Sequence, residues 1–260
     1  MDNLSDGPSL RSGATMPLVG FGTWQTRGEE TYGSVRAALQ AGYRHIDTAT
    51  MYRNEEQVGR ALAESDVDRA DVFVTTKLPA EQAGQARHTL ERSLRDLGLD
   101  HVDLWLIHWP PDGTADPATW QEFLRARNDG LATDVGVSNY SLAQLDELWT
   151  VTGETPSVNQ IRWSIELYDA AIEAGHRERD VLLEGYSPFR RGNLSDPVLQ
   201  SIAAEHGVGP AQVVVRWHVQ HGFVVIPKSA RPERIRSNAD ILGFSLTDDQ
   251  MARLDALSTG

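Results

Sequence analysis

Four ionisable side chains lie at the ends of short β-type runs or in the loops that follow them. Asp47 closes the run GYRHID, Tyr52 follows in the next loop, Lys77 closes VFVTTK, and His108 closes VDLWLIH. A phenol with a pKa of about 10 is a poor acid at neutral pH, and a nearby ammonium group favours its ionised form. Lys77 could therefore tune Tyr52, with Asp47 holding the ammonium in place. The imidazole of His108 could hydrogen-bond a substrate oxygen, so the set suits proton donation to a carbonyl group.

The same residues are compatible with other roles, because the end of a buried strand is also where the chain meets solvent. Asp47 could cap a helix, Lys77 could be a solvated strand end, and His108 could be a loop histidine. A barrel glycosidase could use Asp47 with Glu184 as its second carboxylate. An aldolase could form a Schiff base on Lys77. A cofactor-binding sensor or scaffold would need no turnover at all.

The elements that must position these side chains alternate between strand and helix. Strands are predicted at Leu18–Gly22, His45–Asp47, Val72–Lys77, Val102–Ile107, Val135–Ser138, Val158–Ile161, Val181–Tyr186 and Phe223–Pro227. Amphipathic stretches predict helices that include Glu29–Ala41, Glu55–Glu64, Gln85–Leu97, Ala118–Asn128, Leu142–Trp149 and Pro197–His206. The strand count and spacing favour an α/β protein with a (β/α)8 TIM barrel, whose catalytic groups project from the C-terminal ends of the strands. A doubly wound parallel sheet is the alternative.

Length and composition exclude several classes of protein. No linker or repeat divides the 260 residues, so residues 1–260 are predicted to form one domain. A net charge of −13 argues against general nucleic-acid binding, and no cysteine is present for disulfides, thiolate nucleophiles or zinc. The N-terminus has no run of signal-peptide type, and no segment approaches ~18–20 uninterrupted apolar residues. We therefore expect a cytoplasmic protein with no membrane partner.

A basic cluster follows the last predicted strand and stands out in this acidic chain. The segment IPKSARPERIRSN contains Lys228, Ser229, Arg231, Arg234 and Arg236, with a predicted helix that begins at Pro232. Lysine, hydroxyl and guanidinium groups at a helix N-terminus are suitable partners for a phosphate monoester. No GxGxxG or GxxxxGK(S/T) motif occurs, so a Rossmann or P-loop phosphate cradle is excluded. A solvated basic face is the alternative.

The sequence resembles the aldo-keto reductase family in a set of motifs that run in the family's order from Phe21 to Asn238. The motifs are GYRHIDTATMYRNEEQVGRAL, VFVTTKL, DLWLIHWP, GVSNY, VNQ, GYSPF and IPKSARPERIRSN. The resemblance implies a (β/α)8 barrel that is a monomer, as in most members. It also implies reduction of small aldehydes or ketones to alcohols, with hydride transferred from the nicotinamide C4 of NADPH to the carbonyl carbon.

The resemblance further implies a role for each matched residue. Tyr52 is implied as the general acid, Asp47 and Lys77 as its tuning partners, and His108 as the residue that orients the carbonyl. Among the implied cofactor-binding residues, Ser138, Asn139 and Gln160 would bind the nicotinamide carboxamide, and Tyr186, followed by Ser187, would stack on the ring. Lys228, Ser229 and Arg234 would hold the 2′-phosphate of NADPH, with Asn238 near the adenine. Turn chemistry and core packing are the alternatives for the nicotinamide set.

The expected substrate pocket is aromatic. Trp24 and Trp109 match positions that line the pocket in this family, and Met51, Pro110, Trp163 and Phe189 are further candidates for its apolar wall. Such a wall would suit a carbonyl carried on an apolar or aromatic group, with core packing as the alternative for each Trp. Only a short C-terminal tail follows a helix predicted at Asp248–Leu257, so we expect the pocket to be open on that side.

Two further patterns bear on ligands. Arg190 and Arg191 follow the GYSPF motif and could hold the cofactor pyrophosphate, favour acidic substrates or face solvent. His218 and His221 are spaced by three residues, as a metal-binding pair on a helix could be. Because no third ligand lies nearby, we predict that both are on a helical surface and that no metal binds.

Overall fold

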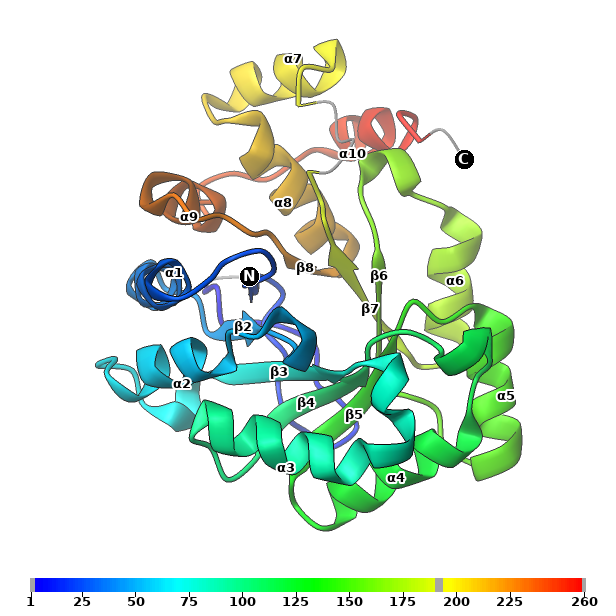
Figure 1. The fold of residues 1–260 in the computed structure, drawn as a ribbon. Helices are drawn as coiled ribbons and strands as arrows, with labels where there is room; N and C mark the ends of the chain where they lie inside the picture. The colour runs from blue at the N-terminus through cyan, green and yellow to red at the C-terminus, as the bar shows by residue number, and fades with distance from the viewer. Residues whose placement is uncertain (1–2, 190–193, 259–260) are drawn as a thin grey trace.

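The computed structural model describes residues 3–189 and 194–258. Eight parallel strands, each paired with the next in sequence order, form a barrel inside a layer of helices (Figure 1). The strands are β1 (Phe21–Gly22), β2 (His45–Asp47), β3 (Phe73–Leu78), β4 (Val102–Ile107), β5 (Ala132–Ser138), β6 (Val158–Arg162), β7 (Leu182–Tyr186) and β8 (Val224–Ile226). A bridge between Val19 and Val225 brings the chain before β1 beside β8. This arrangement confirms the predicted (β/α)8 barrel and excludes the doubly wound sheet.

The helices surround the strands as expected for alternating strand and helix. They are α1 (Glu29–Gln40), α2 (Glu55–Ala63), α3 (Ala86–Leu97), α4 (Pro117–Asn128), α5 (Leu142–Thr152), α6 (Ala170–Glu178), α7 (Pro197–His206), α8 (Pro210–His221), α9 (Pro232–Ala239) and α10 (Asp248–Asp255). The predicted helices are confirmed within a few residues at each end. Helices α6 and α8 have no counterpart among the predicted ranges, although His218 and His221 of α8 are expected on a helix. Helix α9 begins at Pro232 as expected.

Alternation of side chains along the strands separates two apolar regions. Outward-facing residues pack beneath the helices; Trp105 of β4, for example, stacks on Phe123 of α4 with ring centroids 3.6 Å apart. Leu104 and Leu106, its neighbours on β4, face the other way and pack inside the barrel. Because side chains point to opposite faces at a period of two, the inward positions of each strand form layers that rise to the C-terminal end.

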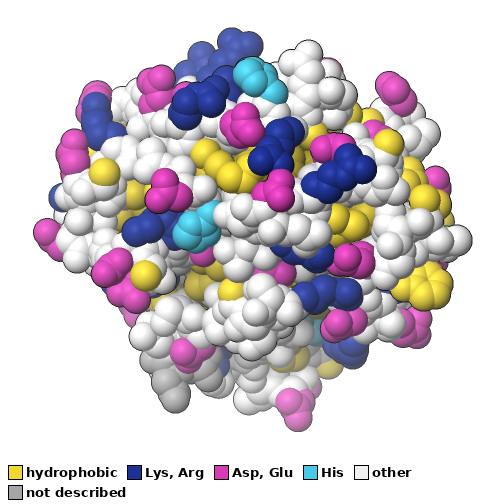
Figure 2. All heavy atoms as spheres, turned by 90° about the horizontal axis from the view of Figure 1, so that it is seen from below, with side chains coloured by type: hydrophobic (Ala, Val, Ile, Leu, Met, Phe, Trp, Pro, Cys, Tyr) yellow, Lys and Arg dark blue, Asp and Glu magenta, His cyan; other side chains and the backbone are white. Residues whose placement is uncertain are grey.

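The surface carries interspersed charges. On the face seen from below, Lys and Arg side chains lie among Asp and Glu side chains rather than forming one basic field (Figure 2). None of the helices in the described part of the chain is long and apolar enough to cross a membrane.

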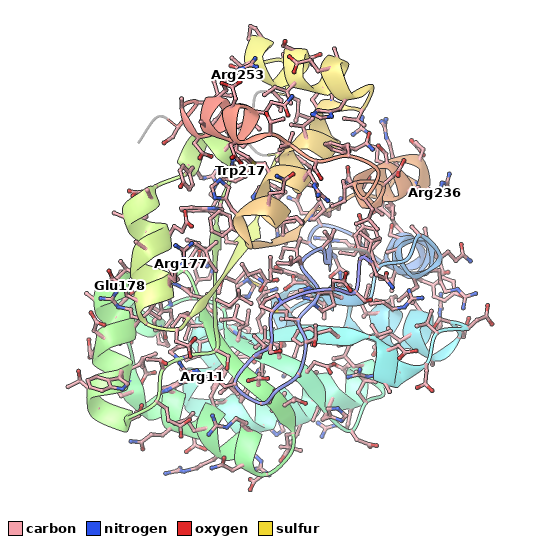
Figure 3. All side chains as sticks on the ribbon, turned by 180° about the vertical axis from the view of Figure 1, so that it is seen from behind. Arg11, Arg177, Glu178, Trp217, Arg236 and Arg253 are labelled. Carbon is pink, nitrogen blue, oxygen red and sulfur yellow. The ribbon has the colours of Figure 1, made fainter. Side chains whose placement is uncertain are left out.

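The N-terminal hairpin fills the opposite end of the barrel from the strand C-termini. Leu10 and Met16, which flank the hairpin bridge between Ser9 and Thr15, pack inside the barrel against the inward residues of several strands. Arg11 lies at the hairpin tip and donates to the carbonyl oxygen of Asp180 (Figure 3). The hairpin therefore covers the N-terminal end of the strand ring.

The two histidines of α8 differ from the prediction in one respect. The helix is present, but the surface prediction is wrong for His218, which is 0% exposed. Its Nδ1 lies 2.8 Å from the carbonyl oxygen of Val214, and its ring packs edge-on against Trp217. Helix α8 is covered by the barrel on one side and by α7 and α9 on others, which explains the burial. Among the described residues, no group of three or more His, Asp or Glu side chains could hold a metal.

The packing of α2 on α3 predicts opposite effects for one substitution at two helical glycines. A Cβ added at Gly59 of α2 would lie 2.2 Å from the carbonyl oxygen of Leu97, whereas one at Gly33 of α1 would meet nothing within 4 Å. Gly59→Ala should therefore destabilise the protein by about 1–3 kcal/mol through overpacking. Gly33→Ala, the matched control, should stabilise it by about 0.5–1 kcal/mol. Urea unfolding of both variants measures the difference, and a stabilised Gly59→Ala variant would contradict the close approach.

Candidate active site

A cavity of about 450 Å³ opens at the C-terminal ends of the strands. Its lining includes most of the predicted site residues: Trp24, Asp47, Tyr52, His108, Trp109, Ser138, Asn139, Gln160, Tyr186, Ser187 and Lys228. These residues lie on, or in the loops that follow, seven of the eight strands, from the loop after β1 to the loop after β8. Residues that are far apart in the sequence are therefore gathered at the one end where barrel enzymes carry their active sites.

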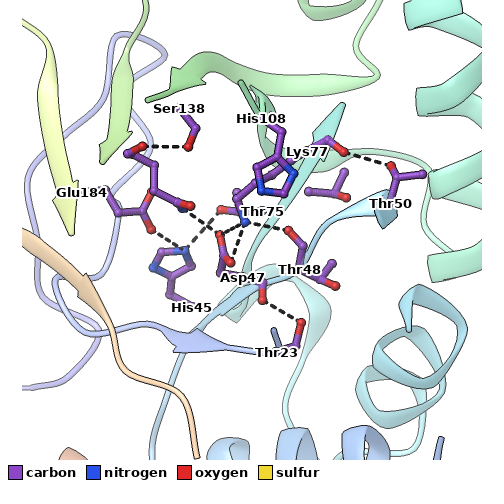
Figure 4. A network of polar contacts seen from close by, with 12 residues as sticks. Thr23, His45, Asp47, Thr48, Thr50, Thr75, Lys77, His108, Ser138 and Glu184 are labelled. Carbon is purple, nitrogen blue, oxygen red and sulfur yellow. Dashed lines mark hydrogen bonds and ion pairs between the residues drawn. The ribbon is translucent and has the colours of Figure 1, made fainter. Parts of the chain in front are cut away.

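The floor of the cavity is an ion pair between Lys77 and Asp47. The Lys77 Nζ lies 2.6 Å from both Asp47 carboxyl oxygens and also donates to the carbonyl oxygen of Thr48 at 2.9 Å (Figure 4). Lys77 is 0% exposed and Asp47 is 2% exposed. The amide Nε2 of Gln160 donates to the same carboxylate at 2.9 Å. Both charged groups are thus desolvated and paired, which excludes the alternatives of a solvated lysine and a helix-capping aspartate.

The protonation of Lys77 follows from these contacts. Burial lowers the pKa of its ammonium group, but the charge of Asp47 and the hydrogen bonds that the ammonium donates to Asp47 raise that pKa above its ordinary value. Lys77 is therefore a cation at neutral pH. Schiff-base formation needs a free, neutral amine that a substrate can reach. The geometry therefore argues against the aldolase alternative.

Tyr52 is placed above this pair by a single turn of 3-10 helix, Thr50–Tyr52. The hydroxyl of Thr50 donates to the backbone carbonyl of Lys77 at 2.9 Å, which ties the turn to β3. The Lys77 Nζ lies 5.2 Å from the centre of the Tyr52 ring. Burial raises the pKa of Tyr52 to about 12, although Lys77 acts in the opposite direction. The predicted effect of Lys77 is present, but it does not outweigh desolvation, so the phenol stays protonated.

His108 completes the group on the other side of Tyr52. The two rings meet edge to face with centroids 5.7 Å apart. Burial, assisted by the charge of Lys77, lowers the pKa of His108 to about 3. Its Nδ1 is buried and has no hydrogen-bond partner among the described residues. The imidazole is therefore neutral and faces a cavity in which a substrate oxygen could be bound.

The residues predicted to bind a carboxamide form a hydrogen-bonded set. The hydroxyl of Ser138 donates to the carbonyl oxygen of Gln160 at 2.7 Å, and the side-chain amide of Asn139 donates to that hydroxyl and to the backbone of His108. Tyr186 donates its hydroxyl proton to the Asn139 Oδ1 at 2.9 Å. This bond holds the Tyr186 side chain at the cavity wall. The structure thus brings these side chains together between β5, β6 and β7.

Three residues that line the cavity have left-handed backbone conformations. Asn139 and Ser187, which follow β5 and β7 directly, have φ values of 64° and 57°, and Gln25 in the loop after β1 has 61°. Left-handed conformations cost non-glycine residues about 1–3 kcal/mol and persist where surrounding contacts fix them, often at functional sites. All three residues line the cavity. Gln25 was not predicted from the sequence, since nothing in the motif GTWQ indicates a left-handed turn.

The basic cluster is divided by the fold. Lys228 lines the cavity, whereas Arg234 lies exposed on α9. Ser229 and Asn238 are both buried, and the Ser229 Oγ accepts a hydrogen bond from the backbone N–H of Arg231 at 3.1 Å. Arg236 points away from the barrel on the outer side of α9 (Figure 3). Arg190 and Arg191 lie outside the described residues.

The aromatic wall is partly as predicted. Trp24 and Trp109 line the cavity and are 43% and 50% exposed, so they stand at its mouth rather than in a core. Met51 and Phe189 also line it, but Pro110 does not. Trp163 is buried in a separate cluster with Trp217 and Phe223, so its predicted place in the wall is wrong. Trp163 directly follows Arg162, the last residue of β6. Because side chains alternate between the two faces, Arg162 points inward and Trp163 points outward, into this cluster.

Glu184, the second carboxylate of the glycosidase alternative, is buried. Glu184 of β7 is 0% exposed and lies inside the strand ring, beside His45 (Figure 4). Asp47 itself is occupied by Lys77 and Gln160. Because the two carboxylates of a glycosidase must flank a bond of the bound sugar, this arrangement argues against hydrolysis.

Comparisons with known proteins agree with the geometry. A family model described as the aldo/keto reductase family matches residues 18–259. The 2,5-diketo-D-gluconic acid reductase B of Corynebacterium sp. (strain SHS752001) is 43% identical over 257 residues, covering 97% of this chain and 93% of that protein. The crystal structure of an aldo/keto reductase from Brucella melitensis is 39% identical, with a TM-score of 0.95 and coverage of 99% and 100% of the two chains.

A third comparison concerns a structure with a bound nucleotide. An aldo-keto reductase of Bombyx mori, solved in complex with NADP, is 34% identical, with a TM-score of 0.89 over 97% of this chain and 93% of that one. The family match covers nearly the whole chain, and the fold and the gathered side chains agree with it. The chain therefore belongs to the aldo/keto reductase family.

Proposed function

We propose that the protein reduces aldehydes or ketones to alcohols with NADPH, and that Tyr52 is the general acid. The observation that carries this proposal is the arrangement of Tyr52 and His108 above the buried Lys77–Asp47 pair, in a cavity open to a small molecule. Cofactor binding alone would require none of these four groups. A protonated phenol, a neutral imidazole and a buried cation together are suited to protonating a carbonyl oxygen.

The residues around the cavity are suited to a nicotinamide cofactor. The set of Ser138, Asn139 and Gln160 offers amide and hydroxyl groups of the kind that recognise a carboxamide, and Tyr186 offers a ring for stacking. These groups bond to one another, so a carboxamide would replace the bond between Asn139 and Ser138. When bound, NADPH would supply the hydride.

The phosphate end of the cofactor would lie toward α9. Lys228 at the cavity edge, Ser229 beside it and Arg234 on α9 are the groups we assign to the 2′-phosphate, with Asn238 near the adenine and Ser187 along the cofactor. The N-terminus of α9 at Pro232 adds the favourable end of a helix dipole. In a chain with a net charge of −13, this is a site where an anion would meet attraction rather than repulsion.

The proton transfer follows from the protonation states. Tyr52 keeps its proton at neutral pH, and an alkoxide that forms beside it is a stronger base than a phenolate. Tyr52 would therefore give its proton to the carbonyl oxygen as the carbon accepts hydride. The ammonium of Lys77 would stabilise the phenolate that remains, and His108 would orient the carbonyl through a hydrogen bond. Trp24 and Trp109 would contact the apolar part of the substrate.

Replacing Tyr52 by Phe tests the role of the phenol. The ring and the cavity remain, so NADPH affinity should change little, while the single-turnover rate of NADPH oxidation should fall by about 10²–10⁴-fold. Tyr32→Phe is the matched control, because the Tyr32 hydroxyl donates to Glu64 at the surface and Tyr32 does not line the cavity. A Tyr52→Phe enzyme with normal turnover would exclude Tyr52 as the acid. NADPH binding with no turnover in the wild type, on any carbonyl, would favour a sensor.

The lowered pKa of His108 predicts a pH profile. A histidine with a pKa of about 3 is neutral throughout the range from about pH 5 to pH 8, so the hydride-transfer rate should show no ionisation near pH 6.5. Single-turnover rates measured across this range, together with the ¹⁵N chemical shifts of the His108 ring, provide the check. A step near pH 6.5 that disappears in His108→Asn would show that the imidazole titrates and that the account is wrong.

The phosphate assignment predicts a difference between two cofactors. Lys228→Glu should weaken NADPH binding by about tenfold or more and leave NADH binding nearly unchanged, because only NADPH carries the 2′-phosphate. Arg95→Glu on α3 makes the same charge change at an exposed position outside the cavity and serves as the control. Dissociation constants from fluorescence titration give the comparison. Equal losses for both cofactors would remove Lys228 from the phosphate site.

A further inference from the structure

A second buried carboxyl group lies beneath the proposed catalytic residues. Glu184 is on the inward face of β7, in register with Gln160 of β6 and Val224 of β8. Its side chain is 0% exposed and points into the barrel, toward His45 (Figure 4). It does not line the cavity, so it touches neither the proposed substrate nor the proposed cofactor.

The contacts of Glu184 are unusual for a carboxylate. Its Oε1 lies 3.8 Å from the Nε2 of His45, and neither oxygen has a hydrogen-bond partner of normal geometry among the described residues. His45 is also 0% exposed, and its Nε2 interacts with the hydroxyl of Thr75 at 3.2 Å. A buried ionised carboxylate normally has two or more donors or a paired cation. Glu184 has neither, because Lys77 is already paired with Asp47.

The groups around Glu184 disfavour its ionised form. From β2 it faces His45 and Asp47, and from β3 it faces Lys77. Burial, together with the charge of Asp47, raises the pKa of Glu184 to about 8, and Gln160 and Lys77 only partly oppose this. Burial also lowers the pKa of His45 to about 3. Glu184 and His45 are thus neutral at neutral pH, and the opposite charges of Lys77 and Asp47 cancel.

The groups on the remaining sides of Glu184 add no charge at neutral pH. His218 of α8 lies against the outer face of β7 at Gly185, and burial holds it neutral by lowering its pKa to about 4. Val224 is the neighbour from β8. Tyr52 and His108 lie on the cavity side of Lys77 and are both uncharged at neutral pH.

We propose that Glu184 is a positioning residue for the reaction: its neutral carboxyl group, enclosed with His45 beneath the Lys77–Asp47 pair, keeps the surroundings of Lys77 free of a second negative charge. The proposal rests on the proposed function, in which Lys77 stabilises the phenolate of Tyr52. Loss of the Glu184 proton would place a second anion near Lys77. That anion would oppose formation of the phenolate and make Tyr52 a weaker acid.

This role predicts that the rate of hydride transfer declines at alkaline pH because Glu184 ionises. The single-turnover rate of the wild-type enzyme should fall as the pH rises through about 8. Glu184→Gln keeps the shape and neutrality of the protonated acid, so it should react within about threefold of wild type at pH 7. Its alkaline decline should move upward by about one pH unit or more, because the ionisation that causes the decline has been removed.

The control is another buried glutamate. Both oxygens of Glu55 accept hydrogen bonds, from Thr76 and Ser93, and Glu55 lies outside the cavity. Glu55→Gln should therefore keep the alkaline decline of the wild type. A purely structural role for Glu184 would change stability but would not move the pH profile. An unchanged profile in Glu184→Gln, or an inactive but folded Glu184→Gln at pH 7, would overturn the proposal.

A second measurement needs no turnover. Infrared spectra of the wild-type protein should contain the carbonyl band of a protonated carboxylic acid at pH 7, and the band should be lost as the pH rises through about 8. The difference spectrum between wild type and Glu184→Gln, where the variant folds, assigns the band. Absence of any such band at pH 7 would overturn the proposal. If no carbonyl compound is reduced, the band still tests Glu184 while the proposed function fails separately.

Discussion

A lysine ammonium group fully buried inside a strand ring is the constraint on which the rest of the site depends. Removing such a cation from water costs several kcal/mol, and good geometry with a counter-ion and further acceptors must offset it. Here Asp47 on the neighbouring strand and the carbonyl oxygen of Thr48 do so. Removing Asp47 alone would leave an unpaired buried charge and would cost about 3–5 kcal/mol.

The barrel supplies what this pair requires. Inward positions recur every second residue, so His45 and Asp47 on β2, and Thr75 and Lys77 on β3, all point into the barrel. Asp47 is in register with Thr75, and Lys77 is the next inward residue of β3. Glu184 shares this buried polar region. Toward the other end the interior is apolar and is closed by the N-terminal hairpin, which keeps water from the underside of the pair. Above them the strands end and the chain turns outward. The polar layer is thus dry on one side and open to a ligand on the other, as general acid catalysis at a tuned phenol demands.

Much of this site could be predicted from the sequence, because Asp47, Lys77 and His108 each end an apolar run and strand ends in a barrel share one rim. The partners of buried groups could not. The pKa of Tyr52 depends on how far burial outweighs Lys77, and the burial of Trp163 and His218 depends on how α8 packs on the barrel. Helix α6 was missed because Gly175, which admits Leu142 of α5, interrupts its apolar pattern. Periodicity records the face of an element but not its neighbour.

The central proposal is that this site directs hydride from NADPH to a carbonyl carbon. The most direct measurement incubates the protein with NADPH that carries deuterium at both positions of the nicotinamide C4 and with aromatic aldehydes, α-dicarbonyls and keto-sugars in turn. The alcohols are then analysed by mass spectrometry. The account predicts an alcohol that carries one deuterium on the former carbonyl carbon and is formed in step with NADPH loss. Saturable NADPH binding without deuterium in any alcohol would contradict it.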